Sequence, residues 1–96
     1  MNKVYVVCEE YRYDYQVDSF IQVFGTMEKA KKCWEEIIER EKMQTWVGDF
    51  MDNYTDADGF VEQEECLFSV SDYDSGNYTI ISISEQEVKW WLKNIE

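Results

Sequence analysis

Two stretches near the start of the chain carry the apolar pattern of β-strands. Residues 4–8 read Val-Tyr-Val-Val-Cys, so both faces of this segment are apolar. A strand that is apolar on both faces is usually covered on both, so we expect it in the interior of a sheet. Residues 17–24 are rich in β-branched and aromatic residues and predict a second strand.

The period of the apolar residues then changes to that of a helix. Gly25 ends the second strand, and Thr26 is a suitable N-cap for the residues that follow. Apolar residues at helical spacing predict a helix over about residues 27–42. Residues 46–54 show the same i, i+4 spacing and predict a second, shorter helix.

The second half of the chain predicts two more strands and a last helix. Residues 65–71 and 78–83 have the composition of strands, and Asp74-Ser75-Gly76-Asn77 between them is typical of a hairpin turn. Ser84 followed three residues later by Glu87 fits a capping box, which predicts that a helix begins there. The apolar stripe of this helix is formed by Val88, Trp91, Leu92 and Ile95.

The order of these elements, β-β-α-(α)-β-β-α, predicts the fold class. A chain of 96 residues makes one domain, so we expect a single α+β domain over residues 1–96. Hairpin-connected strands with separate helices predict a mostly antiparallel four-stranded sheet with the helices packed on one face.

The charge of the chain is concentrated in its second half. No lysine or arginine occurs between Lys42 and Lys89, whereas eleven aspartates and glutamates do, and they account for nearly all of the net charge of −12. Such a surface repels nucleic acid and anionic membranes and attracts basic protein surfaces or divalent cations. We therefore predict a basic protein as the partner, with no direct binding to nucleic acid or membrane.

Several function classes lack the residues they need. The chain has no histidine, which removes the commonest general base and the Ser-His and Cys-His nucleophile pairs. Its three cysteines are widely spaced, which favours small buried hydrophobes over a zinc site. We predict no enzyme and no cofactor. Without a signal peptide or an apolar stretch near the roughly 20 residues of a membrane span, we expect a cytoplasmic protein.

Residues 54–65 resemble a calcium-binding loop of the EF-hand family when Gly59 is placed at its sixth position. Tyr54 stands at the first position, where the family has a carboxylate ligand, and the residues that follow the loop predict a strand. We therefore expect an acidic turn and keep calcium binding as an alternative function. The ligands that the resemblance implies are Asp56, Asp58, Glu62 and Glu65.

Tyr11, Tyr13 and Tyr15 share one face if the first strand continues through them. Tyrosine combines a large contact area with a polar tip and is enriched at interfaces, so this row predicts a secondary interface. A ladder of side chains that packs across a sheet edge is the other interpretation.

The chain as a whole is short, acidic, rich in aromatic residues and without catalytic residues. In this character it resembles small phage and mobile-element proteins of the anti-CRISPR and anti-restriction type, several of which imitate DNA. No motif carries the resemblance, so it transfers no site residue.

The resemblance implies a non-catalytic inhibitor in the bacterial host cell, which occupies the basic nucleic-acid-binding surface of a defence protein such as a CRISPR effector. The acidic surface would then imitate phosphates. A small interaction module whose charge serves solubility alone is a further alternative. Chosen by charge, the predicted partner-binding residues are Asp49, Asp52, Asp56, Asp58, Glu62, Glu64, Glu65, Asp72 and Asp74.

Overall fold

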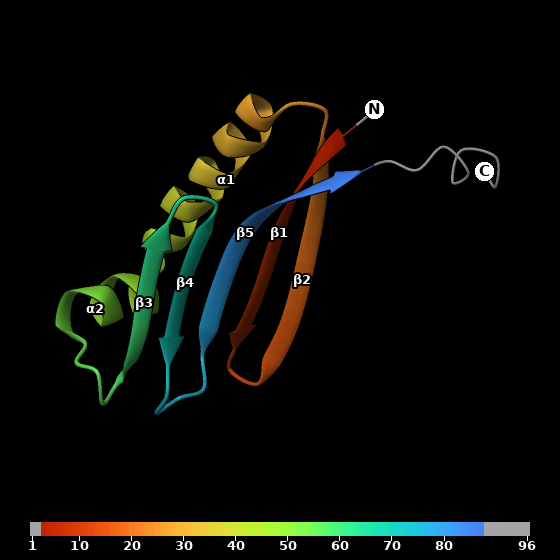
Figure 1. Ribbon diagram of the computed structural model, residues 1–96. Coiled ribbons are helices and arrows are strands. Elements are labelled where there is room, and N and C mark those ends of the chain that lie inside the picture. The colour runs from red at the N-terminus through yellow and green to blue at the C-terminus, as the bar shows by residue number, and fades with distance from the viewer. Residues whose placement is uncertain (1–2, 88–96) are drawn as a thin grey trace.

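A computed structural model, which describes residues 3–87, places five strands in one antiparallel sheet with two helices on one of its faces (Figure 1). Across the sheet the strand order is β2-β1-β5-β4-β3, so β2 and β3 are its two edges. The elements in chain order are β1 (Lys3–Tyr13), β2 (Gln16–Phe24), α1 (Met27–Lys42), α2 (Thr45–Asn53), β3 (Gly59–Glu64), β4 (Leu67–Asp72) and β5 (Tyr78–Glu87).

The core lies between the helices and the covered face of the sheet. α1 buries Ala30, Ile37 and Ile38 on this side. The Trp34 indole lies within the same layer and donates its N–H to the Ile81 carbonyl at 2.9 Å. The strands contribute Val7, Phe68, Val70, Ile81 and Ile83, and α2 contributes Val47. We call the opposite side of the sheet, over which neither helix packs, the open face.

The first half of the chain folds as its pattern predicts. β1 lies inside the sheet between β2 and β5, and β2 covers the predicted residues 17–24. α1 has the predicted bounds because Thr26 caps it, its hydroxyl oxygen accepting from the Lys29 amide at 3.3 Å. The α+β class and the antiparallel pairing are confirmed.

The number of strands was wrong, because β3 was missed. Its sequence, Gly-Phe-Val-Glu-Gln-Glu, lacks a clear apolar alternation since β3 is an edge strand whose Glu62 and Glu64 are exposed. The strand expected over residues 65–71 therefore begins only at Leu67. Glu65 and Cys66 form the turn between β3 and β4, and Cys66 has a positive φ of 67°. The predicted placement of Cys66 in a strand was also wrong.

The helix start expected at Ser84 was wrong as well. Residues 84–87 continue β5, which pairs with the first residues of β1 in the register Tyr5–Glu85 and Lys3–Glu87. Because β1 extends back to Lys3, its backbone offers partners to β5, and this ladder overrides the local capping signal. The apolar stripe expected at residues 88–95 lies outside the described residues.

Candidate functional site

One side of the molecule gathers the acidic residues that the sequence singled out. It is built from α2, residues 54–58, β3, β4 and the β3–β4 and β4–β5 turns, which lie together along one side of the sheet (Figure 1). The loop and the turn are joined because the Tyr73 amide donates to the Asp58 carbonyl at 2.9 Å. We call this surface the acidic side; its carboxylates belong to Asp49, Asp52, Asp56, Asp58, Glu62, Glu64, Glu65, Asp72 and Asp74.

The basic residues lie elsewhere. Within the described residues, every lysine and arginine belongs to β1 or α1. Eight of the nine acidic-side carboxylates are on exposed residues, and Asp72 is half-buried at the end of β4. The fold thus keeps the charge asymmetry of the sequence as an asymmetry in space, because the acidic segments are consecutive in the chain and adjacent in the sheet.

Two of these carboxylates shape the backbone around them. One Asp58 oxygen accepts from both the amide and the hydroxyl of Thr55, each at 3.0 Å. The Asp72 carboxylate accepts from the Asp74 amide at 3.0 Å and from the Ser75 hydroxyl at 2.9 Å. These bonds close the loop and the turn, so Asp58 and Asp72 hold the site in shape and have less capacity to receive a partner's cation.

A third carboxylate, that of Glu65, is paired with a cation. Its oxygen lies 2.8 Å from the Lys31 ammonium, which ties the β3–β4 turn to α1. This hydrogen bond lowers the pKa of Glu65 and raises the pKa of Lys31. The acidic-side carboxylates without a side-chain hydrogen bond or ion pair to the described residues are Asp49, Asp52, Asp56, Glu62, Glu64 and Asp74.

The unpaired carboxylates flank β3 from both faces of the sheet. Gln63 pairs with the core residue Phe68 of β4 and so lies on the covered face. Since successive side chains of a strand alternate between the faces, Glu62 and Glu64 lie on the open face. Asp49 and Asp52 lie on α2, on the covered side. A basic surface that closes around this edge would therefore meet negative charge from both directions.

The fold does not assemble the calcium site of the alternative interpretation. The residues after the loop form β3 instead of a helix, and this strand of six residues, about 20 Å long, separates Asp58 from Glu65. Asp56, Asp58, Glu62 and Glu65 therefore cannot surround one ion. Residues 3–87 hold no group of three or more histidine, cysteine, aspartate or glutamate side chains suited to a metal.

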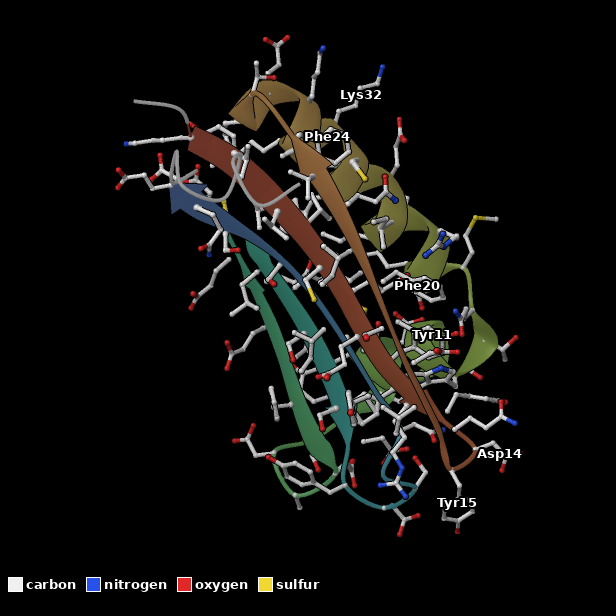
Figure 2. The ribbon with its side chains drawn as sticks, turned by 90° about the vertical axis from the view of Figure 1, so that its right-hand side faces the viewer. Tyr11, Asp14, Tyr15, Phe20, Phe24 and Lys32 are labelled. Atoms are coloured by element: carbon white, nitrogen blue, oxygen red, sulfur yellow. The ribbon has the colours of Figure 1, made fainter. Side chains whose placement is uncertain are left out.

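The predicted tyrosine row is broken after two members. Tyr11 and Tyr13 belong to β1, but Tyr15 lies in the β1–β2 turn with a positive φ of 69°. Figure 2 shows Tyr15 at the tip of this hairpin, well away from Tyr11. There the Arg12 guanidinium sits 5.5 Å from the Tyr15 ring centroid. Tyr11 instead stacks on Phe20 of β2, with ring centroids 6.2 Å apart, so the three rings do not form one surface.

A pocket of about 380 Å³ between α1, β1 and β2 was not predicted. The Glu9 and Glu41 carboxylates are buried in its wall, and the Arg40 guanidinium bridges them, at 2.7 Å from Glu9 and 3.5 Å from Glu41. Burial and the neighbouring Glu9 raise the pKa of Glu41 to about 7. The signal in the sequence was Glu41 itself, a charged residue within the apolar period of α1.

Comparison of the chain with protein-family models, with curated proteins and with solved structures gave no match. Across residues 3–87, neither helix has the length and apolar character needed to cross a membrane.

Proposed function

We propose that this protein is a non-catalytic binding protein whose acidic side docks on the basic, nucleic-acid-binding surface of a partner protein. A phage-type inhibitor of a CRISPR effector or a restriction enzyme, acting in the cytoplasm of a bacterial host, is the class that fits this chemistry. The observation that carries the proposal is the separation of charge: the acidic side bears nine carboxylates and its own segments contain no lysine or arginine.

Charge–charge attraction explains how such a surface would recognise its partner. Carboxylates paired with arginine or lysine form charge-assisted hydrogen bonds, as phosphates do. Attraction between a dense acidic surface and a basic groove speeds association and weakens as salt screens it. The exposed carboxylates without internal partners need lose no existing contact on binding, which favours Glu62, Glu64 and Asp56 as principal contacts.

The absence of compensating bases also has a cost. Uncompensated like charges repel each other and destabilise a compact domain. On the acidic side, the Lys31–Glu65 pair is the one ion pair with a base that the described residues provide. A cluster that weakens its own fold is more readily explained by binding than by solubility alone, which would be served by mixed charges.

Capture of a partner by three forms of the protein tests this proposal. The first bait is the natural chain, the second carries Asp56→Lys, Glu62→Lys and Glu64→Lys, and the third is a matched control. The control carries the same charge reversals on exposed glutamates of α1, namely Glu35→Lys, Glu36→Lys and Glu39→Lys.

From a bacterial lysate we expect the natural bait and the control to capture a basic nucleic-acid-binding protein, which duplex DNA and high salt release. With that partner purified, the acidic-side variant should bind at least about 100-fold more weakly. If both variants lost the same binding affinity, net charge alone would account for the effect. Unchanged binding by the acidic-side variant would exclude the acidic side as the binding surface.

A further inference from the structure

The edge strand β2 is exposed in a way that the rest of the sheet is not. Eight of its nine residues are exposed, on both faces of the sheet, and only Phe24 at its end is half-buried. On the open face Val17, Ile21 and Val23 are 59%, 65% and 60% exposed. On the covered face Phe20 is still 52% exposed. Apolar side chains thus stand in solvent on both faces of one strand.

The backbone edge of β2 is exposed too. Among the described residues, β2 pairs with β1 alone. The N–H and C=O groups of every second β2 residue point away from β1, and these groups have no strand partner. Natural sheets protect such edges with lysine, proline, inward charges or short strands. β2 is nine residues long and contains no lysine, arginine or proline. Its one charged residue is Asp18 on the covered face, so a single inward charge is the only such protection within the strand.

We propose that β2 pairs antiparallel with β2 of a second copy of this chain. A strand that pairs with itself in this way obeys two-fold symmetry, so the contact closes at a dimer. The side-chain pattern of β2 selects a register centred on Phe20. In that register Val17 faces Val23 of the second copy, and Ser19 faces Ile21.

The same register avoids repulsion within the contact. Asp18 faces the Gln22 amide of the second copy, so the two Asp18 carboxylates are not opposed. Directly opposed residues of paired strands share a face of the sheet. The helices of both copies therefore lie on the same side of the dimer, and the open faces of the two copies form one continuous surface. Phe20, which lies beside Tyr11 in Figure 2, would meet its own counterpart at the symmetry axis.

The net charge of −12 does not oppose this contact strongly. β3 lies four strand spacings from β2, or about 19 Å, which exceeds two Debye lengths of about 8 Å at physiological salt. The charges around β2 are mixed. Lys29, Lys32 and Glu36 of α1 line a pocket with Gln22 and Phe24, and Glu10 and Arg12 of β1 pair with Ser19 and Val17. The acidic β3 cannot pair with itself so easily, because Glu62 and Glu64 would be drawn together.

This inference goes beyond the proposed function and does not depend on it. If both hold, the dimer is one continuous sheet with an acidic side at each far end. It would then bind two basic surfaces, or two sites on one partner, with the gain in avidity that bivalency gives.

Sedimentation equilibrium of the full chain tests the contact between about 1 and 100 µM protein. We expect a dimer for the natural chain and for the control Gln63→Lys, which adds the same charge on β3. Ile21→Lys should raise the dimer dissociation constant at least about 100-fold, since it places a charge in the paired edge. Circular dichroism checks folding, and Val23→Lys serves if Ile21→Lys does not fold.

Charge rescue tests the register. Ser19→Glu mixed with Ile21→Lys should restore a heterodimer, because the two positions face each other, whereas Val17→Glu with Ile21→Lys should restore less. A natural chain that stays monomeric throughout this range would overturn the proposal. So would a dimer that Gln63→Lys disrupts and Ile21→Lys leaves intact, and rescue by Val17→Glu alone would overturn the register.

Discussion

The two edges of this sheet are built from the same backbone geometry and differ in their side chains. β3 places Glu62 and Glu64 outward and lies beside the loop that holds Asp56 and Asp58. β2 places Val17, Ile21 and Val23 outward instead. Charge on an edge opposes pairing with another strand, whereas an apolar edge favours it. Because both strands are sheet edges, we infer that charge, and not topology, determines which kind of partner each edge can accept.

The two edges also differ in how the rest of the molecule supports them. β3 is supported by the Phe50 ring of α2, which lies close to Gly59, and by the Lys31–Glu65 contact to α1. β2 is joined to β1 along its whole length, and its outer side has no partner among residues 3–87. The outer side of β3 has no strand partner among residues 3–87 either, so the two edges differ in side chains and support, and in our proposal only the apolar edge gains a strand from a second chain.

The largest loss of stability should come from Gly59→Ala, a substitution at the start of β3 and far from β2. Gly59 has a φ of 155°, and a Cβ there would lie 1.9 Å from the Ser71 carbonyl oxygen and 2.7 Å from the Phe50 ring. We expect a loss of about 2–4 kcal/mol in the free energy of unfolding, because neither neighbour can move without disturbing β4 or α2. Denaturant titration measures it.

The matched control for this change is Gly25→Ala. A Cβ at Gly25 would meet no atom within 4 Å, so its stability should stay within about 1 kcal/mol of the natural protein. Folded Gly59→Ala protein should still dimerise through β2 with the dissociation constant of the natural chain. Equal destabilisation by both substitutions would mean that the close packing at the start of β3 is not what holds this edge.

A smaller change in stability should follow from pH, through Glu41 in the pocket beside β2. The pKa of Glu41 is raised to about 7 from an ordinary value of 4.5, so folding favours its protonated form. Its contribution to stability is complete below about pH 4.5 and is lost as pH rises through about 7. We expect the folded state to be about 2 kcal/mol less stable at pH 8 than at pH 5 from this group.

Thermal unfolding of the natural protein and of Glu41→Gln separates this group from the other acids. Protonation of the acidic side acts in the same direction in both proteins, whereas only the natural protein carries the Glu41 carboxyl. The variant should therefore lose less stability between these two pH values. Identical pH profiles would show that the Glu41 carboxyl does not titrate in this range.

The smallest effect should follow from Glu65→Ala, which removes the tie between α1 and the β3–β4 turn. Both partners are exposed, and exposed ion pairs contribute little to stability. We expect a melting temperature within about two degrees of the natural value. A larger drop would mean that the Lys31 contact braces β3 more than its exposure suggests, and Lys31→Ala should then reproduce it.

The sequence predicts the elements whose signals are local. α1 was placed within its bounds because Thr26 caps it and a long apolar stripe follows. The hairpin turn at residues 74–77 was recognised from its own residues, and Asp72 closes it. The acidic side was also foreseeable as a group, since its segments are consecutive in the chain and the fold adds only their proximity.

What could not be predicted depends on contacts between distant residues. β3 has little pattern of its own and becomes a strand because β4 offers it a complete ladder from Gly59 to Glu64. Residues 84–87 are extended because β1 reaches back to pair with them. The Glu9–Arg40 contact joins residues far apart in the chain, so no local period could reveal it.

Hydrogen exchange of the natural chain at low and high protein concentration tests the contrast between the edges most directly. The account predicts that outward amides of β2 exchange more slowly as concentration rises, while amides of β3 keep the same rates at both concentrations. Slower exchange in β3, or no dependence on concentration in β2, would contradict the claim that the apolar edge is the one that associates.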